Sequence, residues 1–107
     1  MAIIKPYNNR HKINYIVENN ATVLVVDDEP LNIEVMCGML EFRGLICDHA
    51  LSGPIALTLF QDRIEQVISG QANAMYKLVL LDFSMPGMDG PEVATRMRKL
   101  VSQQNHR

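Results

Sequence analysis

The sequence has no tryptophan, only three phenylalanines and three tyrosines, and two cysteines among 107 residues. The shortage of aromatic residues means that a core must be built mainly from aliphatic side chains. The uninterrupted apolar runs are only a handful of residues long, which excludes a membrane-spanning helix within this sequence. Residues 1–21 also lack the apolar centre of a signal peptide. We therefore expect an intracellular, cytoplasmic protein.

The net charge and the two cysteines further limit the partners and the class of protein to be expected. A net charge of −2 gives no electrostatic reason to expect a nucleic acid or an anionic membrane as partner. Cys37 and Cys47 do not form a C-x-x-C motif, and we expect them to be buried thiols that act as small hydrophobic side chains. With 48% hydrophobic and 21% charged residues, the chain is expected to form one small globular domain.

The pattern of the chain changes near residue 22. Residues 1–21 hold five of the eight asparagines and show no convincing period, so we interpret them as a linker or as the tail of a preceding segment. After them, strand-like and helix-like patterns alternate. The expected strands are residues 22–27, 45–49 and 78–82, and the expected helices begin near Pro30, after the N-cap Ser52, and before Val93. We expect the polar residues 102–107 to fray.

Apolar spacing and element order predict the fold class. Ile33, Met36, Cys37 and Leu40 recur at helical spacing, whereas residues 22–27 are continuously apolar, as in a strand buried on both faces. The resulting order βαβαβα is typical of an α/β domain with a parallel sheet and right-handed crossovers. If the second and third strands flank the first, the strand order is 2-1-3.

Acidic side chains end the first and third expected strands. Asp27 and Asp28 follow the first apolar run, and Asp82 follows the third. In the order 2-1-3 these strands are neighbours about 4.8 Å apart, so three carboxylates meet where open α/β sheets bind ligands. Two such charges 4 Å apart repel by about 4 kcal/mol at an effective dielectric of 20. We therefore expect a cation, and oxygen ligands favour Mg²⁺, or Mn²⁺, over zinc.

Two motifs carry a resemblance to a known family. V-L-V-V-D-D-E-P-L-N, followed by L-V-L-L-D-F-S-M-P-G-M-D-G, resembles the receiver domain of two-component response regulators, in the form carried by hybrid histidine kinases. The resemblance covers residues 22 to about 100. It implies a flavodoxin-like, doubly wound parallel sheet, of which this sequence supplies three of five βα units. It also implies a phosphoacceptor signalling domain rather than an enzyme.

The resemblance implies a role for each site residue. Asp82 would accept the phosphoryl group from a phosphohistidine on a histidine kinase or a histidine phosphotransfer protein. Asp28 and Asp82 would bind Mg²⁺ directly, Asp27 mainly through water, and the backbone carbonyl of Ser84 would complete the protein ligands.

Two parts of the family pattern are missing. Family receivers take a Thr or Ser from the end of a fourth strand and a Lys from the end of a fifth, and this sequence has neither position. Lys77 cannot substitute, because it lies five residues before Asp82, roughly 16 Å away. Residues 78–82 would also become an unprotected sheet edge. We therefore interpret residues 22–107 as a C-terminally truncated partial receiver domain that is a fragment or folds with another segment or copy, with self-association through this edge.

Three alternatives remain from the sequence. Asp27, Asp28 and Glu29 would also suit the positive end of the following helix without any metal, although Asp82 favours the metal site. The chain would otherwise be a degenerate receiver that acts as a protein-interaction module. The least favoured alternative is a Mg²⁺-dependent phosphohydrolase with an aspartyl nucleophile, because that chemistry is associated with Asp-x-Asp after the first strand, whereas Asp27 and Asp28 are adjacent.

Overall fold

The computed structural model describes residues 21–104, which form a three-stranded parallel sheet with helices on both faces. The elements alternate along the chain in the order β1 (Val23–Val26), α2 (Pro30–Phe42), β2 (Cys47–Ala50), α3 (Gly53–Ile68), β3 (Leu78–Leu81) and α4 (Gly90–Gln104). The strand order is β2-β1-β3, and both pairings are parallel. The predicted fold class and the predicted order 2-1-3 are therefore confirmed.

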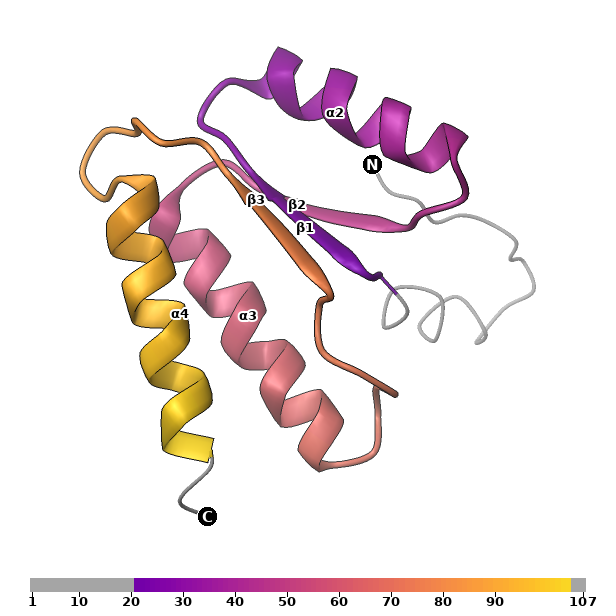
Figure 1. The fold of residues 1–107 in the computed structure, drawn as a ribbon, viewed down its shortest axis with the longest axis vertical. Helices are drawn as coiled ribbons and strands as arrows, with labels where there is room; N and C mark the ends of the chain where they lie inside the picture. The colour runs from indigo at the N-terminus through magenta and orange to yellow at the C-terminus, as the bar shows by residue number, and fades with distance from the viewer. Residues whose placement is uncertain (1–20, 105–107) are drawn as a thin grey trace.

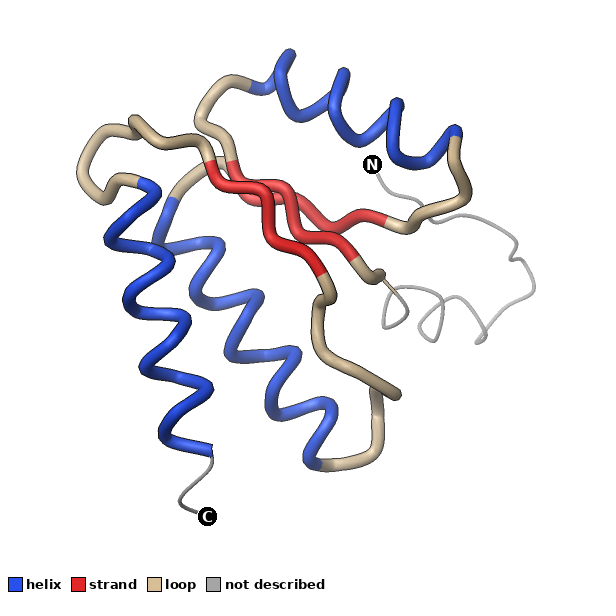
Figure 2. Tube along the Cα trace, viewed as in Figure 1, coloured by secondary structure: helices blue, strands red, loops and turns tan. Residues whose placement is uncertain are grey.

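The helices divide between the two faces of the sheet. Helix α2 lies on one face, while α3 and α4 lie side by side on the other (Figure 1). The tube view shows the strands as the middle layer between them (Figure 2). None of the helices in the described part of the chain is long and apolar enough to cross a membrane.

The central strand β1 contributes to two separate cores. Leu24 and Val26 pack towards α3 and α4, in a cluster that includes Phe60 and Val93. Val23 and Val25, which point to the opposite face, pack in a second cluster beneath α2. Because successive strand residues alternate between faces, a strand that is covered on both faces must be apolar at every position. This explains the uninterrupted Val-Leu-Val-Val run.

Local signals set the helix ends. The Ser52 Oγ accepts a hydrogen bond from the N–H of Ile55 at 3.3 Å, as expected of the predicted N-cap. Helix α2 begins at Pro30 and is followed by Gly44, whose φ of 88° is accessible to glycine at little cost. At the start of α4, the carboxylate of Asp89 accepts from the N–H of Glu92 at 3.0 Å.

Three local predictions were wrong in detail. The second strand begins at Cys47 rather than at residue 45, because the N–H of Leu45 still donates to the Leu40 carbonyl at the end of α2. Helix α4 continues to Gln104, so residues 102–104 are helical and not frayed. Within the predicted apolar face of α2, Ile33 and Cys37 are buried, but Met36 is exposed.

Candidate metal centre

Backbone pairing brings the acidic ends of β1 and β3 to the same edge of the sheet. The N–H of Asp82 donates to the Val26 carbonyl at 2.9 Å, and the N–H of Asp27 donates to the Ala50 carbonyl at 3.1 Å. In this register Val26 pairs with Leu81, so Asp27 and Asp82, which follow these two residues, lie beside each other. One carboxylate oxygen from each of Asp27, Asp28 and Asp82 lies within 4.8 Å of the other two.

The three carboxylates differ in their existing hydrogen bonds. Asp27 accepts at both oxygens, from the N–H of Glu29 at 2.9 Å and from the Asn32 Nδ2 at 3.3 Å. Asp82 accepts at Oδ1 from the N–H of Ser84 at 3.5 Å. Asp28 is exposed to solvent. Asp27 is thus fixed by the start of α2, whereas Asp28 and Asp82 present oxygens that are open to a ligand.

The charge of the cluster requires compensation. Two carboxylates at 4.8 Å repel by roughly 3–4 kcal/mol at an effective dielectric of 20. The hollow beside the cluster has a volume of about 480 Å³, and its lining includes Asp27 and Asp82 but no lysine or arginine. An all-oxygen donor set with accessible positions fits Mg²⁺ or Mn²⁺. The residues present therefore fit such an ion.

The loop after β3 is held close to the cluster. Met85 in this loop is 7% exposed and packs into the core between the sheet and α4. This contact anchors the loop. The N–H of Gly90 donates to the Phe83 carbonyl at 3.1 Å. A side chain at Gly90 would collide with the carbonyl oxygen of Asp82, so only glycine allows this approach. The start of α4 is thus packed directly against the backbone of Asp82.

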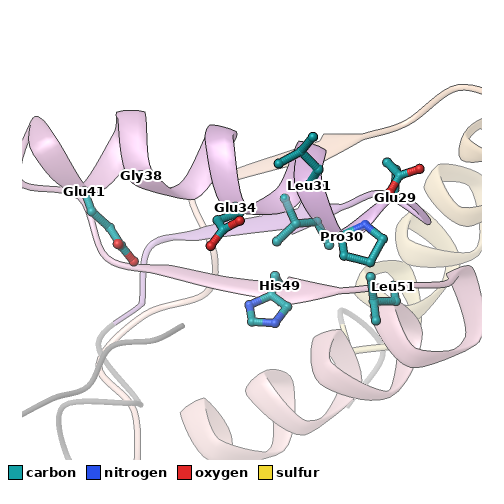
Figure 3. A pocket seen from close by; sticks show the side chains of 9 residues that line it. Glu29, Pro30, Leu31, Glu34, Gly38, Glu41, His49 and Leu51 are labelled. Carbon is teal, nitrogen blue, oxygen red and sulfur yellow. The ribbon is translucent and has the colours of Figure 1, made fainter.

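A larger hollow lies elsewhere, between α2 and β2. It has a volume of about 840 Å³, and Glu29, Glu34, Glu41 and His49 contribute to its lining (Figure 3). The three glutamates are spread from the N-cap of α2 to its last turn, and His49 lies on β2. Among the described residues, only the three aspartates bring their ligand atoms together. The candidate metal centre is therefore the smaller hollow beside Asp27 and Asp82.

Sequence reasoning missed a buried polar cluster at the opposite end of the sheet. Arg63 is 3% exposed, and its Nη1 donates to the carbonyls of Ala21 at 2.8 Å and Ala74 at 3.2 Å. Its Nη2 lies 3.6 Å from the Asp48 carboxylate, which also accepts from the Tyr76 hydroxyl. The guanidinium carbon lies 4.3 Å from the centre of the Tyr76 ring. The cluster joins α3, β2 and the segments that lead into β1 and β3.

Fold and site together define a class of protein. In the order β2-β1-β3, the chain adds β2 on one side of β1 and then β3 on the other, so the topological switch point lies between β1 and β3. The carboxylates lie at the carboxyl ends of those two parallel strands. This is a doubly wound α/β protein with an acidic ligand site at its topological switch point. The chain belongs to the response regulator receiver domain family, whose sequence profile matches residues 23–105.

Similar proteins include sensor kinases and one transcriptional regulator. The chain is 36% identical over 77 residues to hybrid signal transduction histidine kinase L of Dictyostelium discoideum, covering 72% of this chain and 4% of that protein. It is 34% identical over 77 residues to the aerobic respiration control sensor protein ArcB of Escherichia coli, covering 72% of this chain and 8% of ArcB. With the transcriptional regulatory protein ResD of Bacillus subtilis it shares 33% identity over 81 residues, covering 76% and 29%.

A solved structure confirms the architecture. The crystal structure of a mutant of the receiver domain of the histidine kinase CKI1 from Arabidopsis thaliana superimposes with a TM-score of 0.68 at 26% identity. The match covers 87% of this chain and 65% of that chain. This chain therefore spans only a small part of the curated sensor kinases it matches and about two thirds of a solved receiver domain.

Proposed function

We propose that this chain is the phosphoryl-accepting module of a phosphorelay. A carboxylate oxygen of Asp82 would attack the phosphorus of a phosphohistidine on a partner protein. The new P–O bond would form as the P–N bond breaks, and the histidine nitrogen would leave with the electron pair. We assign residues 22–107 to this module as a partial receiver domain, and residues 1–21 to a linker.

Each carboxylate receives a distinct role in this proposal. Asp28 and Asp82, together with the backbone carbonyl of Ser84, would bind Mg²⁺ directly, and Asp27 would act mainly through water. When bound, the metal would neutralise the acidic cluster and stabilise the charge of the transferring phosphoryl group. The assignment is supported by the hydrogen bonds already accepted by both oxygens of Asp27, in contrast to the open position of Asp28.

The observation that carries the proposal is the convergence of Asp27, Asp28 and Asp82 within 4.8 Å at the switch point of a receiver fold. The partner would be a histidine kinase or a histidine phosphotransfer protein, because hybrid kinases are among the proteins similar to this chain. We also propose an intracellular location, because histidine kinases draw their phosphoryl group from ATP.

The test is the intact mass of the protein after incubation with acetyl phosphate and Mg²⁺. We expect one phosphoryl adduct on the wild type and none on Asp82→Asn or in the absence of metal. Asp62→Asn, which removes an exposed carboxylate on α3, is the matched control and should retain the adduct. A folded wild type without any adduct would contradict the proposal and favour a degenerate receiver, whereas turnover of a phosphate ester would favour the phosphohydrolase.

A further inference from the structure

Asn32 lies in the first turn of α2, beside the acidic cluster. Helix α2 begins at Pro30, and the side chain of its N-cap residue, Glu29, makes no capping hydrogen bond. Asn32 instead ties the start of the helix to the preceding loop, because its Nδ2 donates to the Oδ2 of Asp27 at 3.3 Å. Asn32 also lines the same hollow as Asp27 and Asp82. The roles proposed for the three aspartates leave this amide without a role of its own.

Asp27 is held at both carboxylate oxygens by two donors of different kinds. The N–H of Glu29 donates to Oδ1 at 2.9 Å, and this backbone donor does not depend on the residue at position 32. Among the described residues, Asn32 is the only side chain that donates a hydrogen bond to any of the three aspartates. A bond at Oδ1 alone leaves the carboxylate free to turn about that contact, whereas the second bond at Oδ2 fixes its plane. The orientation of Asp27 therefore depends on Asn32.

The orientation of a carboxylate decides how many oxygens it gives to a metal ion. Mg²⁺ is small, requires near-octahedral geometry at about 2.0–2.1 Å, and keeps several water molecules. Ca²⁺ takes about 6–8 oxygens at about 2.3–2.6 Å in a flexible shell, often with both oxygens of one carboxylate. Because the two oxygens of Asp27 already accept hydrogen bonds from the start of α2, this carboxylate resists turning to bind an ion with both. A restrained Asp27 therefore favours Mg²⁺ over Ca²⁺.

The chemistry at position 32 separates metal selectivity from folding. Aspartate has nearly the same shape as asparagine, but its ionised side chain only accepts hydrogen bonds. In place of Asn32 it would lose the bond to Asp27 and add a fourth carboxylate to the hollow. More carboxylate oxygens, less restrained, are what Ca²⁺ prefers. Acidic side chains are favourable in the first turn of a helix, so this exchange should not unfold α2.

We propose that Asn32 is a positioning residue of the candidate metal centre. By holding the Oδ2 of Asp27, it keeps that carboxylate from binding an ion through both oxygens, and so sets the preference of the site for Mg²⁺ over Ca²⁺. The inference rests on the metal binding of the proposed function, but not on phosphoryl transfer. Residues that orient metal ligands through hydrogen bonds typically change metal affinity by about 10–100-fold when they are replaced.

Competition against Mn²⁺ on the full chain tests the proposal. Electron paramagnetic resonance measures the Mn²⁺ that is released from the protein as Mg²⁺ or Ca²⁺ is added, and the two titrations give the ratio of Mg²⁺ affinity to Ca²⁺ affinity. We expect the wild type to prefer Mg²⁺. Asn32→Asp should lower the ratio about tenfold, and Asn32→Ala, which removes the donor without adding a ligand, should lower it by a smaller factor.

Asn73→Asp is the matched control. Asn73 is exposed in the segment between α3 and β3, which leads to the end of β3 opposite Asp82. The variant adds the same charge as Asn32→Asp, so a general attraction of divalent cations acts in both. Its ratio of Mg²⁺ affinity to Ca²⁺ affinity should equal that of the wild type. Circular dichroism of each variant reports whether the protein is folded.

The other outcomes would overturn the inference. A wild type that prefers Ca²⁺ would do so, as would an unchanged affinity ratio in both Asn32 variants, because a residue that only supports the fold has no means to distinguish the two ions. Loss of the folded spectrum in both variants would likewise assign Asn32 to folding alone. These results, with Mn²⁺ still bound by the wild type, would leave the proposed function intact. A folded wild type that binds no Mn²⁺ would instead contradict the metal centre itself, and the inference with it.

Discussion

The N–H of Asp82 donates to the carbonyl oxygen of Val26 over 2.9 Å, and this single bond fixes the relative height of the two acidic strand ends. Because Val26 immediately precedes Asp27, the bond places Asp82 beside Asp27 and Asp28. A shift of one residue along the pairing would move the two ends apart by about 3.3 Å and turn the side chains of β3 to the opposite face. The geometry of the acidic cluster therefore depends on sheet register.

The first prediction concerns Mg²⁺. At a free Mg²⁺ concentration 100 times its Kd, the free energy of unfolding should increase by about 2.7 kcal/mol, because the folded protein alone has the assembled site. Urea unfolding with Mg²⁺ and with a chelator measures this difference. Asp28→Asn and Asp82→Asn should lose most of the effect, whereas Asp62→Asn should retain it. Equal stabilisation of all three variants would contradict a site at the acidic cluster.

A second prediction concerns the contact between α4 and the backbone of Asp82. Gly90→Ala would drive a methyl group into the Asp82 carbonyl oxygen, and we expect it to lower the free energy of unfolding by about 1–3 kcal/mol. Gly38→Ala is the matched control, because nothing lies within 4 Å of a side chain added there. That exchange, in an exposed helix interior, should stabilise the protein by roughly 0.5–1 kcal/mol. Chemical denaturation measures the free energy of unfolding of both variants, which should fall for Gly90→Ala and rise for Gly38→Ala.

Alkaline pH should destabilise the protein through Tyr76. Burial, followed by its hydrogen bond to Asp48, raises the pKa of the Tyr76 phenol far above its ordinary value of 10.0. Above pH 10 the unfolded chain loses this proton while the folded protein keeps it. The free energy of unfolding should therefore fall by up to about 1.4 kcal/mol per pH unit. Tyr76→Phe should remove this part of the fall, and an unchanged slope between pH 10 and 11.5 would refute the assignment.

The buried thiols should contribute to the same loss at lower pH. Burial raises the pKa of Cys47 from 9.0 to about 12, and it also raises the pKa of the neighbouring Cys37. The thiols keep their protons in the folded protein above pH 9, whereas those of the unfolded chain ionise. Stability should thus be fully present below pH 9 and decline above it. Cys47→Ala should reduce the decline between pH 9 and 10, measured by urea unfolding under reducing conditions.

The last prediction separates two phenylalanines by their burial. Phe60 is 7% exposed in the core between the sheet and α3, whereas Phe42 is 92% exposed at the end of α2. Phe60→Ala should cost about 3–5 kcal/mol, because it removes a buried ring and leaves a cavity. Phe42→Ala should change the free energy of unfolding by less than about 0.5 kcal/mol. Similar losses for both variants would show that α2 is covered in solution.

Most of the fold was accessible from the sequence because its signals are local. The apolar run of β1, the cap at Ser52 and the turn at Gly44 each act over a few residues, and they located the strands and helices to within about two residues. The start of β2 was misplaced, because Leu45 remains hydrogen-bonded to the last turn of α2. That bond depends on how the helix ends, which residue type alone does not specify.

The burial of Arg63 was not accessible in this way. It lies on the helix face that carries Phe60 and Ile64, and a charged residue in such a stripe is normally expected at the edge of the core. Its hydrogen bonds go to the carbonyls of Ala21 and Ala74, which are 42 and 11 residues away. Only folding brings these acceptors together, so no local pattern could predict that the guanidinium would be satisfied inside.

The sequence by itself determined the alternation of strands and helices, the apolar faces, and the presence of aspartates after β1 and β3, because residue spacing and backbone preference encode them directly. The tertiary structure decided the pairing of Val26 with Leu81, the distances among Asp27, Asp28 and Asp82, and the burial of Arg63. These depend on long-range backbone hydrogen bonds and on which elements lie next to each strand. Local periodicity carries no information about either until the chain has folded.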